Sequence, residues 1–195
     1  MIVGSALLAF AFLCHSIVLL VVEPAMGFRE FSDFFDLEKV IPALSSRAWY
    51  VGNIMHVAIG FGLLLLASGI HSASIPRAVL TASFGFAAAP LFVVIGMSGF
   101  VGDQLVGLLV DNAERDAALL GLIGARTMML YAAVAVFGGM ILAISAPSDF
   151  MPRWLRLLGL PAGIAALIFA IVPTPIPLIL FIWSAALLFC LWRET

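Results

Sequence analysis

The sequence predicts an all-α integral membrane protein, a six-transmembrane-helix bundle, from its composition and from the length of its apolar stretches. Of its 195 residues, 64% are hydrophobic and only 10% are charged, whereas soluble domains carry about 25% charged residues. The apolar stretches are about 20 residues long, which at ~1.5 Å per residue spans the ~30 Å hydrocarbon core of a bilayer. They do not alternate with period two, as barrel strands do. We therefore expect one helical membrane domain over residues 1–195, without a soluble domain.

Six stretches fit a membrane crossing. We predict spans at about 2–22, 50–70, 77–99, 124–146, 153–172 and 175–193. The first is expected to remain in the protein, because no basic residue precedes it and no cleavage pattern of small residues follows it. The apolar run 117–146 exceeds one crossing, so residues up to about Gly124 are assigned to an interfacial or protruding turn. Ala135, Gly139 and Ala143 recur every four residues, a spacing of small residues that lets two helix backbones approach closely.

The connection between the first two spans, residues 23–49, combines aromatic and charged residues. On a helical wheel its large apolar residues share one side, and they are Phe28, Phe31, Phe34, Phe35 and Ile41. This predicts an amphipathic interfacial segment that ends at Pro42, followed by a helix with Ser45 or Ser46 as its N-cap. We expect the segment to form an aromatic lid over the mouth of the bundle; a docking surface for a partner is the alternative.

Polar residues inside the spans mark the candidate site. Asn53 and His56 lie three residues apart in the second span, so they share a helix face that must look at other helices rather than at lipid. His15, in the first span, and His56 are expected ~10 and ~9 Å from the same outer face. Arg126 and Asp103 border that outer half. These five residues predict a polar ligand pocket in the outer half of the bundle.

Three roles are open for His15 and His56. A neutral histidine can simply hold helices together through a hydrogen bond, the pair can belong to a pocket, or His15 and His56 can be the axial ligands of a haem b. The sequence contains no catalytic motif and no cluster of metal-ligand residues within a span, so we predict no catalytic residue and no metal site. The expected function is that of a non-enzymatic accessory subunit or a small-ligand-binding membrane protein. The alternatives are a bis-histidine haem b electron carrier and a small transporter.

Charge indicates orientation and partners. Six crossings place both termini on one side, and that side carries arginines in its short connections, namely Arg77, Arg153, Arg156 and Arg193. Basic residues close to the spans favour the cytoplasmic side, so both termini are predicted to be cytoplasmic. The net charge of −2 and the lack of a basic run argue against nucleic-acid binding. The expected partners are the lipid bilayer and other membrane protein subunits.

The run MPRWLRLLGLPAGIAALI, residues 151–168, precedes a short reversal and a final span that ends in Trp192 and Arg193. This part resembles the C-terminal third of a bacterial family of small multi-pass membrane proteins that is known only as a domain of unknown function. The order of spans and connections is also similar. The resemblance implies a membrane fold and a location in the bacterial inner (plasma) membrane, and it implies no catalytic residue.

Overall fold

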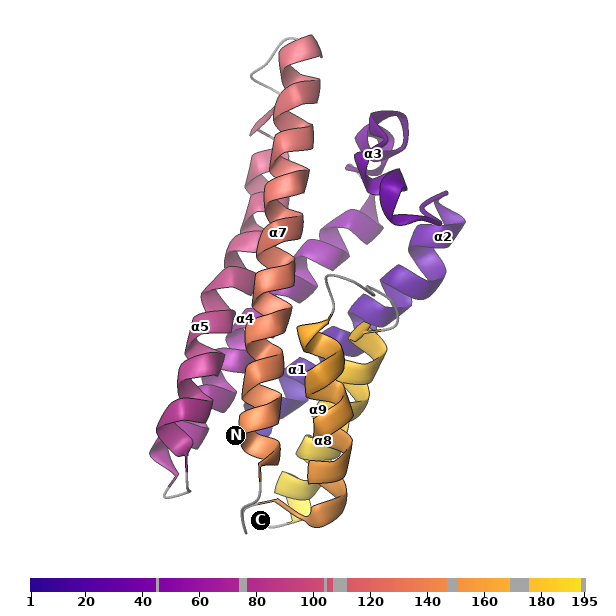
Figure 1. The fold of residues 1–195 in the computed structure, drawn as a ribbon. Helices are drawn as coiled ribbons and strands as arrows, with labels where there is room; N and C mark the ends of the chain where they lie inside the picture. Colours follow the sequence, from indigo (N-terminus) through magenta and orange to yellow (C-terminus); the bar gives the residue numbers. More distant parts are fainter. Residues whose placement is uncertain are drawn as a thin grey trace.

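The computed structural model describes residues 1–44, 46–73, 77–103, 105–106, 112–146, 151–168 and 176–193, and the regular structure in these ranges is helical. Figure 1 shows the arrangement of the helices. The elements are α1 (Ile2–Ile17), the π-helix η1 (Val18–Val22), α2 (Glu23–Ala25), the 3₁₀-helix η2 (Phe31–Phe35), α3 (Leu37–Ala43), α4 (Arg47–Ser72), α5 (Ala78–Met97), the π-helix η3 (Ser98–Gly102), α7 (Asn112–Ser145), α8 (Arg153–Leu167) and α9 (Ile176–Arg193).

Five helical segments are long and apolar enough to cross a membrane. They are Ile2–Ala25, Arg47–Ser72, Ala78–Gly102, Ala113–Ser145 and Ile176–Arg193. Large apolar side chains also cover the outside of the bundle; Val79 is 66% exposed and Met128 67%, which suits lipid and not water. The predicted all-α, multi-pass membrane class is therefore confirmed. Helix α8 has 15 residues, and the predicted span 153–172 runs on into residues 169–172, outside the described part, so a sixth crossing stays a prediction.

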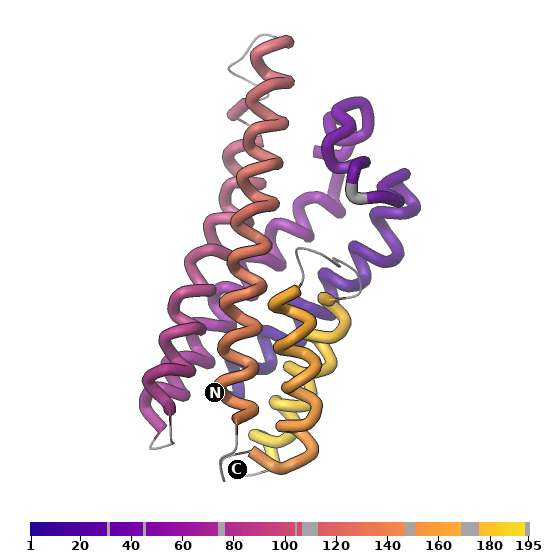
Figure 2. Tube along the Cα trace, in the orientation of Figure 1, coloured from indigo at the N-terminus to yellow at the C-terminus, as the bar shows by residue number. Residues whose placement is uncertain are grey.

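Helix α4 packs against α1 and α5, while α7 packs against α5 and α8, and α9 against α1 and α8. Figures 1 and 2 show the long helices running side by side, with both chain termini at the same end; we call this the terminal end. Half of the apolar window of α4 is buried, more than in the other four segments. Another face of the helix is open, since Ile54, Phe61 and Leu65 are 46%, 53% and 46% exposed. The face that carries Asn53 and His56 looks at other helices, as predicted, although α4 is not surrounded on all sides.

Glycines set the closest contacts between helices. A Cβ atom built on Gly4 of α1 would lie 2.6 Å from the backbone nitrogen of Leu66 in α4, and one built on Gly60 would lie 2.8 Å from the carbonyl oxygen of Ala89 in α5. Side chains larger than hydrogen at these positions would force the helices apart.

The small-residue stripe predicted on the fourth span does not form a backbone contact at Gly139. A Cβ atom there would meet the ring of Phe84 at 3.0 Å, which is a side-chain contact with α5. The backbone contact occurs one residue earlier, where a Cβ atom on Gly138 would lie 2.9 Å from the carbonyl oxygen of Gly163 in α8. A four-residue spacing identifies a helix face, but it does not identify which neighbouring helix covers that face.

Helix α7 is longer than expected. The predicted turn up to about Gly124 is absent, because residues Asn112–Ser145 form one continuous helix of 34 residues. At ~1.5 Å per residue this is about 51 Å, well beyond the ~30 Å of a hydrocarbon core, and Figure 1 shows its first turns projecting past the other helices. The residues 113–120, AERDAALL, are mostly strong helix formers, and this propensity extends the helix outward from the membrane-spanning part.

The connection between α2 and α4 forms two short helices, η2 and α3, instead of one continuous amphipathic helix. Asp36 separates them in extended conformation, and its carboxylate accepts a hydrogen bond from the Glu38 N–H at 3.1 Å. Pro42 lies inside the last turn of α3, one residue before the helix ends at Ala43. Ser46 caps α4 by accepting a hydrogen bond from the Trp49 N–H. The serine cap was predicted, whereas the break at Asp36 was not.

The aromatic face of this connection is divided. Phe28 is only 5% exposed and packs in a small cluster with Val40, Ala43 and Ile123 of α7, joined by Phe34, Leu44 and Trp49. Phe35, which the helical wheel places on the same face, is 37% exposed. Phe28 lies outside η2 and is separated from it by Glu30 in extended conformation, so the two residues do not share a helix and point in different directions. We call residues 26–35 the lid, since five of them line the cavity described below.

Candidate functional site

A cavity of about 520 Å³ lies in the half of the bundle away from the termini. Residues of the first helical segment, the lid, α4, α5, α7 and α9 all contribute to its wall. Most of the lining side chains are apolar or aromatic, and exposed Met26, Arg29 and Glu30 form part of the rim. A volume of this size, lined mainly by apolar groups with a few convergent polar ones, is typical of small-molecule sites.

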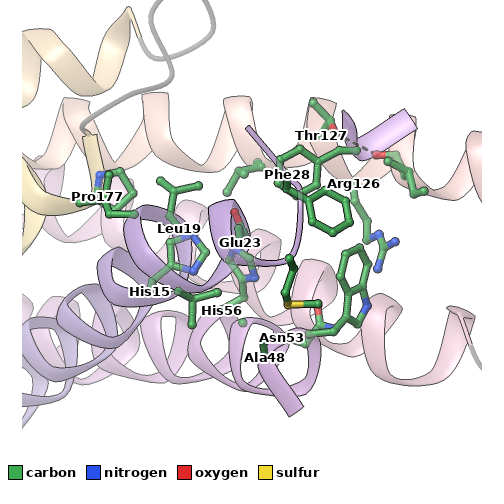
Figure 3. Close-up of a pocket in the computed structure, with 18 of the residues that line it drawn as sticks. His15, Leu19, Glu23, Phe28, Ala48, Asn53, His56, Arg126, Thr127 and Pro177 are labelled. Carbon is green, nitrogen blue, oxygen red and sulfur yellow. Dashed lines mark hydrogen bonds between the residues drawn. The ribbon is translucent and has the colours of Figure 1, made fainter. Parts of the chain in front are cut away.

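Four of the five residues predicted to form a pocket lie on the wall of this cavity: His15, Asn53, His56 and Arg126. Figure 3 shows His15 and His56 next to each other, with Arg126 on the other side of the view. The fifth, Asp103, is bonded to Arg126 just behind the wall. The sequence therefore identified residues that the tertiary structure brings together, although they come from different helices.

The two imidazole rings are in direct contact. Their centroids are 4.8 Å apart and the rings are inclined at 61°, an edge-to-face arrangement, which confirms that His15 and His56 lie at the same depth. Among the described residues, His15 Nδ1 and both ring nitrogens of His56 have no partner with good hydrogen-bond geometry. The backbone of Gly52, one turn earlier in the same helix, lies within reach of the His56 ring. The pair thus presents donor and acceptor atoms that the protein leaves unused.

Arg126 and Asp103 form an ion pair at the outer end of the cavity. The Arg126 guanidinium donates to Asp103 Oδ2 at 2.8 Å, and the side chains are 10% and 1% exposed. Trp49 Nε1 donates to the same oxygen at 2.9 Å, and the guanidinium carbon lies 5.8 Å from the Trp49 ring centroid. Asp103 thus neutralises Arg126 and holds Trp49 in place, so this positive charge of the wall already has its counter-ion.

Asn53 is held by glycines of the adjacent helix. It is 7% exposed, and Gly99 of η3 lies so close that a Cβ atom there would overlap the Asn53 carboxamide. The amide nitrogen of Asn53 has no hydrogen-bond partner among the residues that the structure describes. A buried amide without a partner costs free energy unless a further group satisfies it.

Two π-helices precede the two acidic residues of this region: η1 ends just before Glu23, and η3 just before Asp103. In η1 the Glu23 N–H donates to the carbonyl of Val18, five residues earlier. The ring of Pro24 accounts for this wider turn, because proline lacks an N–H and clashes with the carbonyl four residues before it. In a regular α-helix Glu23 would lie about 80° around the axis from His15. The π turn rotates less per residue and brings Glu23 back onto the wall that His15 occupies.

A glycine turn connects Glu23 to the lid. Gly27 has φ +95°, and the N–H groups of Gly27 and Phe28 donate to the carbonyls of Pro24 and Glu23 at 3.2 and 3.0 Å. This is the Schellman arrangement that ends many helices, and it requires a left-handed residue that glycine supplies. It places Phe28 directly against the turn that carries Glu23.

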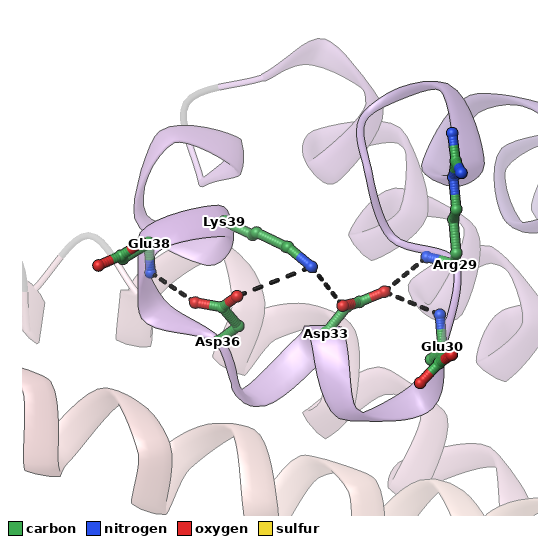
Figure 4. A network of polar contacts seen from close by, with 6 residues as sticks. All are labelled: Arg29, Glu30, Asp33, Asp36, Glu38 and Lys39. Atoms are coloured by element: carbon green, nitrogen blue, oxygen red, sulfur yellow. Dashed lines mark hydrogen bonds and ion pairs between the residues drawn. The ribbon is translucent and has the colours of Figure 1, made fainter.

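A polar network fixes the far side of the lid (Figure 4). Asp33 accepts hydrogen bonds from the backbone N–H groups of Arg29 and Glu30 at 2.7 and 2.8 Å, and it forms an ion pair with Lys39. Lys39 also lies 3.7 Å from Asp36. The hydrogen bond from Lys39, followed by those from the two backbone groups, lowers the pKa of Asp33 to about 2. The charged form of Asp33 thus stabilises the fold of the lid.

Three buried aromatic rings lie on the terminal side of the cavity. Phe12 and Phe137 stack with centroids 5.8 Å apart, and Phe137 meets Trp183 edge to face at 6.0 Å. Their exposed fractions are 3% or less. These rings join α1, α7 and α9 in an apolar layer between the cavity and the chain termini.

Two residues of the wall are not among the predicted pocket residues. Trp49 lines the cavity and donates a hydrogen bond to Asp103; its spacing of four and seven residues from Asn53 and His56 places all three on one helix face. Glu23 also lines the cavity. The sequence Glu-Pro-Ala-Met-Gly-Phe carries the signal for its position, since proline and glycine there predict the distorted turn and the helix end.

The fold and the cavity together define the class of this protein: a multi-pass α-helical membrane protein with an internal cavity. Comparison with protein families, with curated proteins and with solved structures finds nothing that matches this chain. The resemblance of residues 151–168 to a bacterial membrane family therefore stays a prediction.

Proposed function

We propose that this protein is a membrane protein that binds a small, largely apolar ligand in the cavity beneath the lid. One observation carries the proposal. A cavity of about 520 Å³ has unused polar atoms of His15, Asn53 and His56 on its wall, where the described residues offer them no hydrogen-bond partner. Such atoms are costly in an apolar interior, and a ligand that pairs with them recovers that cost.

The geometry argues against a haem between the two histidines. In bis-histidine ligation each imidazole nitrogen lies about 2 Å from an iron on opposite faces of the macrocycle, so the ring centroids must stand well apart with the macrocycle between them. Here the rings touch, with centroids 4.8 Å apart, and Gly4 holds α1 tightly against α4. This arrangement does not fit a haem, and we derive no electron-transfer role from it.

Binding of a small ligand agrees with either of two wider roles. An accessory subunit of a larger membrane complex and a small transporter both use such a cavity, and both remain predictions. For the location we infer the bacterial inner membrane with cytoplasmic termini. The arginines on the side of the termini support this orientation, as does the position of both termini at one end of the bundle.

Filling the cavity tests the proposal. Gly52 lines the cavity, and a Cβ atom built on it meets nothing within 4 Å, so Gly52→Phe introduces a ring there without displacing the backbone. Gly121 of α7 is equally open but does not line the cavity, which makes Gly121→Phe the matched control. Native mass spectrometry of the purified full chain measures small molecules that remain bound after the detergent is removed.

We expect bound small molecules on the wild type and on Gly121→Phe, and their loss on Gly52→Phe. All three proteins should have the same thermal unfolding temperature within a few degrees. Equal retention of bound molecules by Gly52→Phe would contradict the proposal, as would a wild-type protein that carries none.

A further inference from the structure

Glu23 is a carboxylate without a counter-ion on the wall of the cavity. Among the described residues it forms no ion pair, and its side chain is half-buried. Its helical segment, Ile2–Ala25, is one of the five that are apolar enough to cross a membrane. An ionised carboxylate that is partly removed from water costs free energy unless a cation faces it.

The other charged groups on the wall of the cavity do not provide a counter-ion for Glu23. Arg126 is neutralised by Asp103 at 2.8 Å. Arg29 and Glu30, one of each sign, are exposed at the rim. The wall of the cavity therefore carries one unmatched negative charge, and the missing partner is a single positive charge.

Aromatic rings line the same cavity as this charge. The hydrogen bond from the Phe28 N–H to the Glu23 carbonyl joins the two backbones at 3.0 Å, and the Phe28 ring lies 5.0 Å from that of Phe34. Both phenylalanines line the cavity. The Trp49 ring already faces Arg126, and the two phenylalanines, which belong to the segment directly after Glu23, supply further aromatic surface to the cavity. Aromatic faces attract organic cations through their quadrupole, most strongly where water is excluded.

We propose that the ligand of this cavity is an organic monocation with an apolar body, whose positive charge is bound between the Glu23 carboxylate and the phenylalanines of the lid. The apolar body occupies the part of the cavity lined by aliphatic and aromatic side chains. This inference rests on the proposed function, since it names the chemical class of the ligand that the cavity binds. A carboxylate at the protein surface is solvated by water. Glu23 instead lies on a largely apolar wall of the cavity, where a cationic ligand would stabilise its charge.

Two probes of nearly the same shape separate charge from size. Methyltriphenylphosphonium carries one positive charge, and triphenylphosphine oxide is neutral. Isothermal titration calorimetry of each probe into the full chain in a non-ionic detergent compares their affinities. Blank titrations into empty micelles are subtracted from both.

The matched pair of variants is Glu23→Gln and Glu114→Gln. Each removes one carboxylate, but Glu114 is exposed on α7 and does not line the cavity. We expect the wild type to bind the cation at least about tenfold more tightly than the neutral probe, as measured for buried charge pairs. Glu23→Gln should lower the affinity for the cation by a similar factor and leave that for the neutral probe unchanged, and Glu114→Gln should change the cation affinity less than about twofold.

Equal affinity of the wild type for both probes would overturn this inference and leave the proposed function standing. This comparison uses the wild type alone and does not depend on the folding of any variant. Unchanged cation binding by a folded Glu23→Gln would overturn it as well. Failure of both probes to bind the wild type would overturn the inference together with the proposed function.

Discussion

The imidazole rings of His15 and His56 meet edge to face with their centroids 4.8 Å apart. The contact joins α1 to α4 in the membrane-spanning part of the bundle, and it forms one wall of the cavity. The rings touch, so there is no space for a macrocycle between them, and His15 Nδ1 has no hydrogen-bond partner among the described residues.

The first prediction follows from this contact. Purified protein incubated with haemin should show no Soret band shift that depends on the histidines, because both rings cannot reach one iron from opposite faces. Absorption spectra of the wild type, His15→Ala and His56→Ala measure this, with free haemin in detergent as the blank. A red-shifted Soret band that disappears in either variant would contradict the prediction and revive the electron carrier.

The buried ion pair should matter for stability. Arg126→Ala leaves Asp103 charged, 1% exposed and without its cation, and loss of one partner of a buried pair costs about 3 to 5 kcal/mol. Arg115→Ala is the control, since Arg115 pairs with Asp116 at 3.1 Å in a partly exposed position, where the cost is about 0 to 1 kcal/mol. Thermal unfolding in detergent measures the stability of both variants, and Arg126→Ala should be the less stable of the two.

A double variant distinguishes the loss of the ion pair from the loss of side-chain packing by Arg126. Asp103→Asn combined with Arg126→Met removes both charges and keeps an oxygen that accepts from Trp49 Nε1. It should recover most of the stability lost in Arg126→Ala, because replacing both partners is often neutral. A double variant as unstable as Arg126→Ala would mean that the guanidinium acts through its packing.

The contact between α7 and α8 gives a third prediction. Gly138→Leu places a side chain where the Gly163 carbonyl stands, and overpacking costs about 1 to 3 kcal/mol. Gly124→Leu on the same helix is the control, because a Cβ atom there meets nothing within 4 Å. Comparable unfolding temperatures for the two variants would show that α8 can shift away from α7 without cost.

Acid should loosen the lid. Asp33 has a pKa of about 2 in the folded protein, against a usual value of 3.8, so its stabilising contribution is complete above about pH 3.8. That contribution falls as the pH drops through this window and is lost below about 2. Carboxyl chemical shifts in a ¹³C NMR titration measure the pKa directly. Lys39→Met should move the midpoint upward, although not fully to 3.8, since the bonds from Arg29 and Glu30 remain; an unchanged midpoint would contradict the role of Lys39.

The fifth prediction concerns the orientation of the protein in the membrane. A cysteine at Ser32 of the lid should react with an impermeant thiol reagent in intact bacterial cells, because arginines in the short connections favour a cytoplasmic location for the termini and the lid is then expected outside. The native cysteines are replaced by alanine first, and the protein without the added cysteine is the blank. Labelling only after the cells are lysed would reverse the topology.

The sequence by itself determined the class of this protein and the residues that meet in its interior. A charged fraction of 10% and apolar stretches of membrane length require helices in lipid, because only intra-helical hydrogen bonds satisfy the backbone there. Asn53 and His56 within such a stretch require neighbouring helices around them. Matching depth then indicated His15 as a neighbour, and depth can be counted along a helix at a fixed rise per residue.

Only the tertiary structure decided how these residues are oriented and what they leave unpaired. The two π turns and the break at Asp36 depend on where packing tolerates a distortion, and this is not encoded in the spacing of residue types. The spacing of residue types also does not show how a helix is rotated about its axis relative to its neighbours. In the structure, Gly138 rather than Gly139 faces a neighbouring backbone. The same limit applies to Glu23, which a regular helix would turn away from His15 and which the π turn before Pro24 brings onto the wall of the cavity.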